Sequence, residues 1–465
     1  MDASAPQGSA TASLESFGYK QELKRSLKLR DLVGYGLAMI SPIAPVAVFG
    51  YVFNASAGMV PLVYAVGLTA MLFTAWSYIT MARAFPIAGS VYAYASRSLG
   101  QVAGFIAGWA ILLDYLLVPS LMYLLSAIAL TSVVPAVPKW VWLGILLVCN
   151  GAANLFGVAN TTRVSAYMMM CQVLFLALFM TIAIIAVTDG TAGASFSTAP
   201  LVNPAGISPG VIFGALSIAA LSFLGFDAIS TLAEESEGGG RTVGKATIIV
   251  LIVAALLFIG QTYIMSLFIL GQTSLPAGDA TDQASYNIAG DIGGTWLKVL
   301  VSLAGGALAC IPSALTAQTA TSRLLFGMAR DGKLPRFLAH VSEGRRVPDR
   351  AVLLVSAITI ALMVYFEDRV GTLASMINFG ALTGFIFVNL SVIAHYTVRH
   401  KDGLWGRHIV APAIGVAFIG YVLWNMEPFA QMAGLAWLAI GLCIFIAGKV
   451  FGATTLPIPE APPSH

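Results

Sequence analysis

Residues 36–45 read Gly36-Leu-Ala-Met-Ile-Ser-Pro-Ile-Ala-Pro45, and residues 219–227 read Ala219-Ala-Leu-Ser-Phe-Leu-Gly-Phe-Asp227. Each stretch interrupts a long apolar run with residues that do not suit a regular helix, and the second stretch ends in an acid. Backbone groups freed from a helix inside hydrocarbon cost several kcal/mol each, so such breaks persist only where they line a buried site. Broken helices in corresponding halves of a membrane protein are typical of secondary transporters. The two breaks therefore predict a protein that moves a solute across a membrane.

The composition is that of an integral membrane protein. Hydrophobic residues make up 58% and charged residues 10% of the 465 residues, whereas about a quarter of residues are charged in soluble domains. The mean hydropathy is +0.86, and a net charge of +3 gives no reason to expect a nucleic-acid partner. Because a span needs about 20 apolar residues, we expect twelve transmembrane helices, at about 31–54, 60–82, 101–130, 139–157, 164–188, 207–233, 245–271, 294–322, 350–366, 370–396, 408–426 and 430–450.

The basic residues predict the orientation of the chain. They concentrate before Asp31 and in the stretch 323–350. If the amino terminus is cytoplasmic, only Lys139, Lys298 and Arg369 fall on or near the other side, and 21 of the 24 basic residues lie inside. We therefore expect both termini in the cytoplasm. The polar start of the chain has no cleavable signal pattern, so the first span is expected to target the protein to its membrane.

The placement of the breaks predicts two halves. They lie five predicted helices apart, so helices one to five and six to ten each begin with a broken helix, and an odd number of spans makes the second half inverted. Two helices are left over, and both tails are expected to be cytoplasmic and disordered. The predicted organisation is a tail at 1–30, a first repeat at 31–188, an inverted repeat at 207–396, two further helices at 408–450 and a tail at 451–465.

Two acids lie well inside the predicted spans, Asp114 in the third helix and Asp227 after the second break, and no Lys or Arg lies at comparable depth. An ionisable residue at that depth indicates function by default, because it is costly without a partner. Two uncompensated carboxylates favour an organic ammonium, a sodium ion or protons. Structural alternatives stay open: Asp227 is also placed to cap a helix that resumes after the break, and Asp114 to serve as a hydrogen-bonded architectural acid.

The prolines of the first break favour an amine over an amino acid. A substrate carboxylate is typically held by N–H groups at an unwound helix end, and neither Pro42 nor Pro45 has one. The break is therefore a poor anion site. Ile43 and Ala44 remain as the possible donors.

Further side chains near the breaks are candidates for the same site. Trp109, Tyr115, Phe223 and Phe226 are placed to face an ammonium in cation–π contact, worth about 0.5–2 kcal/mol each, or to pack between helices. Asn378 is a polar group inside the tenth span, where it serves either as a link between helices or as part of the site.

The sequence gives no support for an enzyme. It contains no His-Glu-x-x-His, no Walker phosphate loop and no Gly-x-Ser-x-Gly. We expect no enzyme activity, no metal site and no cofactor. Without an ATP-binding domain, uphill transport must use an ion gradient or exchange.

Five motifs carry a family resemblance: Leu113-Asp-Tyr115, residues 85–94 (Phe-Pro-Ile-Ala-Gly-Ser-Val-Tyr-Ala-Tyr), residues 222–235 around the second break, residues 322–331 (Ser-Arg-Leu-Leu-Phe-Gly-Met-Ala-Arg-Asp) and residues 377–382 (Ile-Asn-Phe-Gly-Ala-Leu). With them the chain resembles the amino acid–polyamine–organocation transporter superfamily, from about residue 25 to 450. Within that superfamily it looks most like bacterial putrescine importers, sharing their Leu-Asp-Tyr-Leu and Phe-Val-Asn-Leu-Ser pieces.

The resemblance implies a multi-pass protein of the bacterial cytoplasmic membrane with the five-plus-five inverted repeat of the leucine transporter type. It also implies proton-driven uptake and a pocket between helices one, three, six, eight and ten, with Asp114 and Asp227 as candidates for proton coupling. A similar Phe-Asp-Ala break also occurs in relatives that carry amino acids. Carried over, the pocket residues are Ser41, Pro42, Ile43, Ala44, Asp114, Tyr115, Ser222, Phe223, Gly225, Phe226, Asp227 and Asn378.

The chain departs from the family pattern in its fifth helix. Several proton-coupled amino-acid relatives place a lysine there, whereas residues 164–187 contain none and Gln172 is the main strongly polar residue. Proton coupling would then fall on a carboxylate. Sodium held by helix-one carbonyls with Ser313 or Thr316, and obligatory exchange, stay open as alternatives.

These observations together predict an importer of putrescine or a similar short amine, working by alternating access. Asp114 is expected to pair with one ammonium group, and Asp227 to meet the other or to cycle a proton. The alternatives are a proton- or sodium-coupled amino acid permease, an amino acid–amine exchanger, a transporter-like sensor and a channel.

Overall fold

The computed structural model describes residues 27–85, 90–155, 162–203, 207–232, 236–330, 336–342, 348–399 and 404–450. Within these ranges every regular element is a helix, and the one bridge between extended segments pairs Leu27 with Ser236. The prediction of an all-α chain is confirmed. Residues 1–26 and the tail predicted at 451–465 lie outside the described residues.

Nine helical segments of the described chain are long and apolar enough to cross a membrane, and each overlaps a predicted span. They are α4 (Val60–Ala84), α6 (Gln101–Val133), α8 (Thr162–Thr188), α10 (Gly239–Ser266) with η4 (Leu267–Ile269), α13 (Thr295–Ser302) running through η5 (Leu303–Cys310) into α14 (Ile311–Arg330), α15 (Asp349–Phe366), α16 (Val370–Ile393) with η7 (Ala394–Arg399), η8 (Gly406–Val410) with α17 (Ala411–Trp424), and α18 (Pro428–Val450).

The other predicted spans are short or broken. α2 (Leu29–Ile40) and α3 (Ala44–Ala55) meet at 46° and form a tenth span if they cross together. The helices at the fourth and sixth predicted positions are short, so the count of twelve spans stays a prediction. They are α7 (Lys139–Leu155) and α9 (Pro209–Ala219) with η2 (Ala220–Phe223).

Six further short elements connect these helices. They are α5 (Ser90–Leu99), η1 (Thr191–Gly193), η3 (Asp227–Leu232), α11 (Asp279–Asp282), α12 (Ala284–Gly293) and η6 (Arg336–Ala339).

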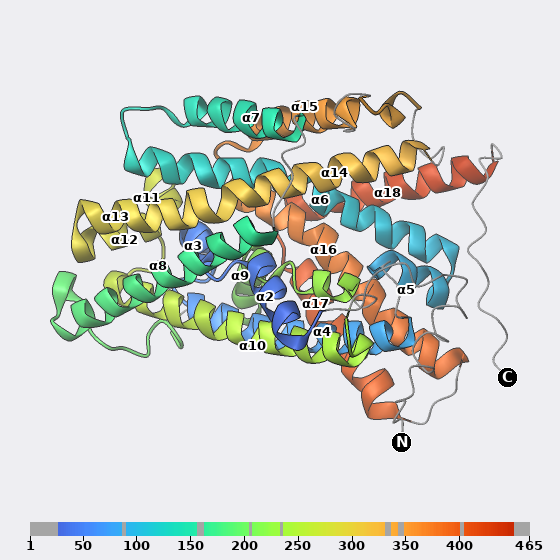
Figure 1. Cartoon of the computed structure of the whole chain (residues 1–465). Coiled ribbons are helices and arrows are strands. Elements are labelled where there is room, and N and C mark those ends of the chain that lie inside the picture. The colour runs from blue at the N-terminus through green and yellow to red at the C-terminus, as the bar shows by residue number, and fades with distance from the viewer. Residues whose placement is uncertain are drawn as a thin grey trace, which may run out of the picture.

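The long helices run side by side in one bundle (Figure 1). α7 and α15 lie together along one side, and α4 and α10 lie together along the opposite side. The short helices α2, α3 and α9 lie between these two sides. The interruptions in the chain are thus gathered in the interior of the bundle.

The first break falls where the sequence predicts it. α2 ends at Ile40 and α3 begins at Ala44, and the residues between them belong to neither helix. Pro42 and Pro45 have no N–H with which to continue the hydrogen bonds of α2. Ser41 adopts φ = 60° and ψ = 105°, a sparsely populated conformation for a residue with a Cβ atom. The prolines and the strained serine together turn the chain between the two half-helices.

The second break is longer than predicted. The α-helix ends at Ala219, a 3₁₀ turn continues to Phe223, and Gly225 has φ = 110°. The sequence predicted that an α-helix resumes after Asp227. This is wrong within the described residues, where the 3₁₀ helix η3 follows instead. Residues 233–235 lie outside the described ranges.

The acidic connection at 272–291 folds into two short helices. It contains α11 and α12, and both helices contact α3. Asn54 of α3 donates hydrogen bonds from Nδ2 to the Leu275 carbonyl (3.1 Å) and to Thr281 Oγ1 (3.0 Å), and Ser285 Oγ donates to the Val46 carbonyl. Small and acidic residues predict solvent exposure, but here the small ones allow two short helices to pack closely on α3.

Candidate functional site

The two breaks lie against each other. A Cβ atom at Gly225 would lie 3.1 Å from the carbonyl carbon and oxygen of Met39, in the last turn of α2. The φ of 110° at this position is also one that only glycine adopts easily. A Cβ atom at Gly36 of α2 would lie 2.5 Å from Ile229 Cδ1 in η3. α2, the N-terminal half of the first broken helix, therefore packs directly on the second break.

The two predicted acids come together beside these breaks. Asp114 of α6 and Asp227 of η3 are close enough to interact electrostatically, and Tyr115 interacts with both acids and with Tyr35 of α2. Both carboxylates are half-buried, and Tyr115 is 41% exposed. The structure thus gathers Asp114, Tyr115 and Asp227 in one place, as predicted. Tyr35 joins them and was missed, because nothing distinguishes one tyrosine in an apolar helix from a packing residue.

In the described ranges, basic side chains do not offset the two carboxylates. Among the described residues, no Lys, Arg or His nitrogen lies within 4 Å of Asp114 or Asp227, and the ion pairs present there involve other acids. Asp227 Oδ1 accepts a hydrogen bond from the Gly225 N–H at 3.3 Å. The same carboxylate interacts with the backbone N–H groups of Asp227 and Ala228 at the start of η3. Capping by Asp227 is therefore present, toward the break and toward a 3₁₀ helix rather than an α-helix.

The phenylalanines of the second break pack into the core. Phe223 and Phe226 are fully buried. The Phe223 ring lies 5.9 Å from Tyr64 and 5.4 Å from Phe258, between ring centroids, and the Phe226 ring lies 5.6 Å from Tyr78. In this structure both rings hold the break in place, which is the packing alternative, rather than forming an accessible wall for an ammonium.

Trp109 packs against α18. Its indole N–H donates to the Trp437 carbonyl at 2.8 Å, the Trp437 indole N–H donates to the Trp109 carbonyl at 2.8 Å, and the rings stack 4.7 Å apart. A Cβ atom at Gly441 would clash with Trp109, so α18 needs a glycine there. Trp109 therefore anchors α18 on α6, which corrects its placement among the candidates for cation–π contact.

Asn378 links two helices next to the second break. Its Nδ2 donates to the carbonyls of Ser217 (2.7 Å) and Ile218 (3.2 Å), at the end of α9. Its side chain is fully buried, and its Oδ1 has no hydrogen-bond partner among the described residues. The linking role left open by the sequence is present, and the unpaired oxygen leaves a second role possible.

Polar side chains from three other helices hold the breaks. Ser41 Oγ donates to Gln172 Oε1 of α8 at 2.7 Å, and Gln261 Nε2 of α10 donates to the Pro42 carbonyl at 2.9 Å. At the second break, Ser222 Oγ and Tyr64 Oη of α4 lie 2.9 Å apart and share a hydrogen bond. Gln261 and Tyr64 were missed, although a glutamine inside an apolar run is a usable signal.

The backbone of the first break offers few donors. The Ala44 N–H donates to the Ser41 carbonyl at 3.0 Å. Of the two donors left open by the sequence, this leaves Ile43, because the neighbouring Pro42 and Pro45 have no N–H. That this break is a poor site for a carboxylate stays a prediction.

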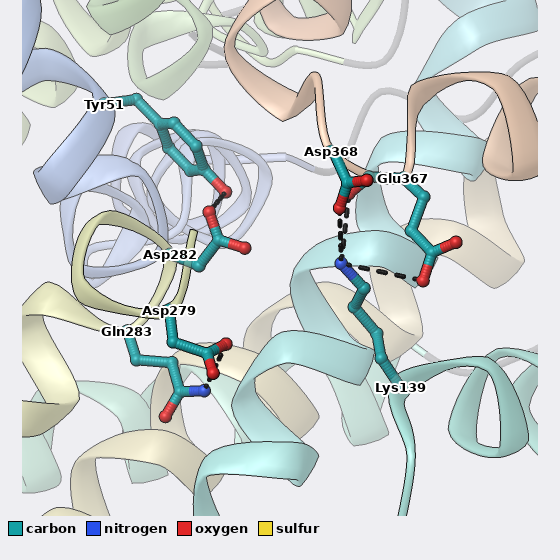
Figure 2. Close-up of polar contacts among 7 residues, drawn as sticks. All are labelled: Tyr51, Lys139, Asp279, Asp282, Gln283, Glu367 and Asp368. Carbon is teal, nitrogen blue, oxygen red and sulfur yellow. Dashed lines mark hydrogen bonds and ion pairs between the residues drawn. The ribbon is translucent and has the colours of Figure 1, made fainter. Parts of the chain in front are cut away.

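One end of the bundle carries a cavity of about 490 Å³ that the sequence did not reveal, lined by Asp282, Asp368, Glu427 and residues of α3 and α16. We call it the acidic end. Here Tyr51 Oη donates to Asp282 Oδ1 at 2.8 Å, and Lys139 Nζ lies 3.8 Å from Glu367 Oε1 and 3.6 Å from Asp368 Oδ1 (Figure 2). The cavity leads toward α3 rather than lying between Asp114 and Asp227.

Burial beside α3 raises the pKa of Asp282 above its ordinary value, against the lowering effects of Tyr51 and Lys139. Asp282 therefore binds a proton more readily when α11 is packed on α3 than when Asp282 is in water. The packed arrangement gains stability as the pH falls through the raised pKa toward the ordinary value near 3.9.

We expect a cysteine at Thr372, beside the same cavity, to react more slowly with a maleimide at lower pH, relative to a free thiol. Asp282→Asn should abolish this dependence. A dependence that survives Asp282→Asn would contradict the assignment.

Broken helices that meet beside two acids, with no basic partner for either acid in the part of the chain that the structure describes, define a solute permease when they lie inside a multi-pass membrane protein. Residues 32–448 match the family model of amino acid permeases, and the chain belongs to that family. The predicted superfamily is thereby confirmed, and with it the prediction of a transporter rather than an enzyme.

Relatives within the family carry different solutes. The chain is 33% identical over 437 residues to the low-affinity putrescine importer PlaP of Escherichia coli (strain K12), covering 92% of this chain and 94% of that protein. It is 25% identical over 454 residues to the branched-chain amino acid permease BcaP of Bacillus subtilis (strain 168), covering 92% and 93%. It is 24% identical over 466 residues to the methylthioribose transporter of Bacillus subtilis (strain 168), covering 94% and 95%.

Proposed function

We propose that the chain is a secondary active importer of putrescine or a similar short diamine, driven by protons and working by alternating access. The observation that carries this proposal is the pair of half-buried acids, Asp114 and Asp227, which interact with each other and have no basic partner within 4 Å among the described residues. Two carboxylates near each other at this depth repel one another unless cations or protons arrive. A diamine brings one ammonium group for each.

The backbone around the acids favours an amine without an α-carboxylate. The Gly225 N–H already donates to the Asp227 carboxylate, and the Ala44 N–H already donates to the Ser41 backbone carbonyl. The N–H groups that would hold a substrate carboxylate are therefore largely used. The 33% identity to a putrescine importer supports the same substrate class.

Amino acid transport is the second candidate, because BcaP is related over 92% of this chain. An amino acid would place its ammonium on Asp114 and its carboxylate on the remaining donors near Ile43. That arrangement uses one acid only. It leaves Asp227 to carry a proton.

Coupling to protons is proposed for the carboxylates. A proton on Asp227 would reduce its repulsion with Asp114 when no substrate is bound, and an arriving ammonium would displace it. Ser313 Oγ, considered above for sodium, donates to the Ala309 carbonyl of its own helix at 2.8 Å. The side chain of Thr316 lies outside the described residues.

The contacts that hold the breaks support the inverted repeat. The first break is held by Gln172 of the fifth predicted span and Gln261 of the seventh, and the second by Asn378 of the tenth and Tyr64 of the second. An inverted five-plus-five repeat relates span one to six, five to ten, and seven to two. The four contacts follow these pairs, and with this topology we place both termini in the cytoplasm of a bacterium and the acidic end outside.

The proposal is tested with purified full-length protein in proteoliposomes. We expect saturable accumulation of labelled putrescine that a protonophore abolishes and that unlabelled short diamines reduce more than leucine or arginine. Competition by amino acids and not by diamines would favour the second candidate. Flux that neither saturates nor accumulates against a gradient would indicate a channel and overturn the proposal.

A further inference from the structure

Gln172 connects the first break to a distant helix. Its Oε1 accepts a hydrogen bond from Ser41 Oγ at 2.7 Å, and its Nε2 donates to the Leu308 carbonyl at 3.1 Å. The side chain is 6% exposed. One neutral amide therefore joins the end of α2, the middle of α8 and the segment η5.

The partner segment η5 has carbonyls to offer because it is not a regular α-helix. Residues 303–310 form a π-helix inside the eighth predicted span, and such segments often occur at functional sites. Besides Leu308, the Gly306 carbonyl accepts from Ser126 Oγ at 3.2 Å. Ser126 of α6 and Gln172 of α8 thus both bind carbonyls in this segment. Of these two side chains, Gln172 is the one that also binds Ser41 in the first break.

The other partner, Ser41, is strained. A φ of 60° costs a residue with a Cβ atom of order 1–3 kcal/mol and persists only where the surroundings support it. The Ser41 N–H donates to Leu37 within α2, and its hydroxyl donates to Gln172. The bond to Gln172 is the side-chain contact that ties this strained residue to another helix.

The two halves of the first broken helix are held very differently. α3 is mostly buried, and hydrogen bonds of Tyr51, Asn54 and Val46 fasten it to α11 and α12. α2 buries only Leu32 and two other residues. The hydrogen bond from Ser41 to Gln172 ties the end of α2 to α8, and Gln261 of α10 binds the Pro42 carbonyl just beyond that end.

We propose that Gln172 is a positioning residue that latches the end of α2 to η5, and that this latch must open for α2 to leave the second break during transport. Its amide satisfies both partners without taking up a proton or an ion. The proposal rests on the proposed function only in assuming transport, and not on the identity of the substrate.

The test uses a reporter cysteine at Ile40, a buried residue in the last turn of α2, in full-length protein whose four native cysteines are replaced. Gln172→Leu keeps the size of the side chain and removes both hydrogen bonds. We expect it to raise the maleimide labelling of the reporter by about 3- to 10-fold. This is the factor expected when the end of α2 loses one buried hydrogen bond, the one from Ser41 to Gln172. A reporter at Val52 of α3, also buried, should stay protected.

Gln172→Glu separates a latch from general packing. A protonated glutamic acid has the shape of glutamine and donates to Leu308, whereas the carboxylate repels that carbonyl. The measured quantity is the labelling rate of the Ile40 reporter in Gln172→Glu divided by its rate in the parent chain at the same pH. This ratio should be near one at acid pH and rise as the pH increases. Titratable groups on elements that contact α8, such as Tyr35 and Tyr286, are common to both chains and cancel in the ratio.

Two controls make the outcome decisive. Thr181→Val removes an α8 hydroxyl that bonds within its own helix, and it should leave labelling unchanged. Ser41→Ala leaves Gln172 in place and should act in the same direction as Gln172→Leu, even if the latter folds poorly. Unchanged labelling in both Gln172→Leu and Ser41→Ala, or a flat pH ratio for Gln172→Glu, would overturn the latch. A failure of putrescine uptake in the parent chain would overturn the proposed function and leave this readout intact.

Discussion

Replacing Asp114 by Asn is expected to raise the KM for putrescine by about 10- to 100-fold. The amide has nearly the shape of the carboxylate but lacks its charge, and a hydrogen bond to a charged partner contributes about 1.5–3 kcal/mol, at about 1.4 kcal/mol for each factor of ten. Among the described residues, Asp114 has no basic side chain within 4 Å. Its charge is therefore available to an incoming ammonium. Initial rates of labelled uptake into proteoliposomes, over a range of substrate concentrations, measure the effect.

The matched control is Asp189→Asn, which changes an exposed acid outside the bundle core and should leave KM unchanged. Asp114→Glu retains the charge but moves it, and it should recover part of the lost affinity. A parental KM in Asp114→Asn would remove this residue from the substrate site. Equal losses in Asp114→Asn and Asp189→Asn would point instead to a loss of surface charge.

The breaks and the acids could be predicted because their signals are local. Pro42 and Pro45 cannot continue a helix, and an acid in an apolar run is costly wherever the run lies. The structure confirms the first break between Ile40 and Ala44 and brings Asp114 near Asp227. Such features follow from the chemistry of one stretch of chain.

The partners of those features could not be predicted because they come from distant parts of the sequence. Gln172 lies 131 residues from Ser41, and Gln261 lies 219 residues from Pro42. An apolar span is apolar on all sides, so its pattern does not say which face meets which helix. Trp109 shows the consequence, since it was placed near the acids and instead faces α18.

Local backbone departures were also beyond the sequence. The π-helical segment 303–310 reads as an ordinary apolar run, and the 3₁₀ helix after Asp227 reads as a resumed α-helix. Each is stabilised by tertiary contacts rather than by the propensities of its residues. Ser126 and Gln172 bind carbonyls in the first segment, and Gly36 packs against the second.

Gly50→Ala is expected to lower putrescine uptake by about tenfold without unfolding the protein. A Cβ atom on Gly50 of α3 would clash with the backbone carbonyl of Thr281 in α11, closer than real Cβ atoms approach. Overpacking against a well-packed element costs typically about 1–3 kcal/mol. Here the backbone of α11 must move away from α3, so the acidic end is held open. If transport requires this end to close, the variant accumulates in the open form, and a cysteine at Thr372 beside the cavity should react faster with a maleimide.

Gly34→Ala provides the matched control, because a Cβ atom at Gly34 of α2 meets nothing within 4 Å. It makes the same chemical change in the other half of the first broken helix and should leave both uptake and labelling at Thr372 as in the parent chain. If Gly50→Ala slows uptake while labelling stays unchanged, the glycine matters for packing alone and closure of the acidic end is not involved. Faster labelling together with unimpaired uptake would show that α11 leaves α3 without consequence, and that closure at this end is not part of the transport cycle.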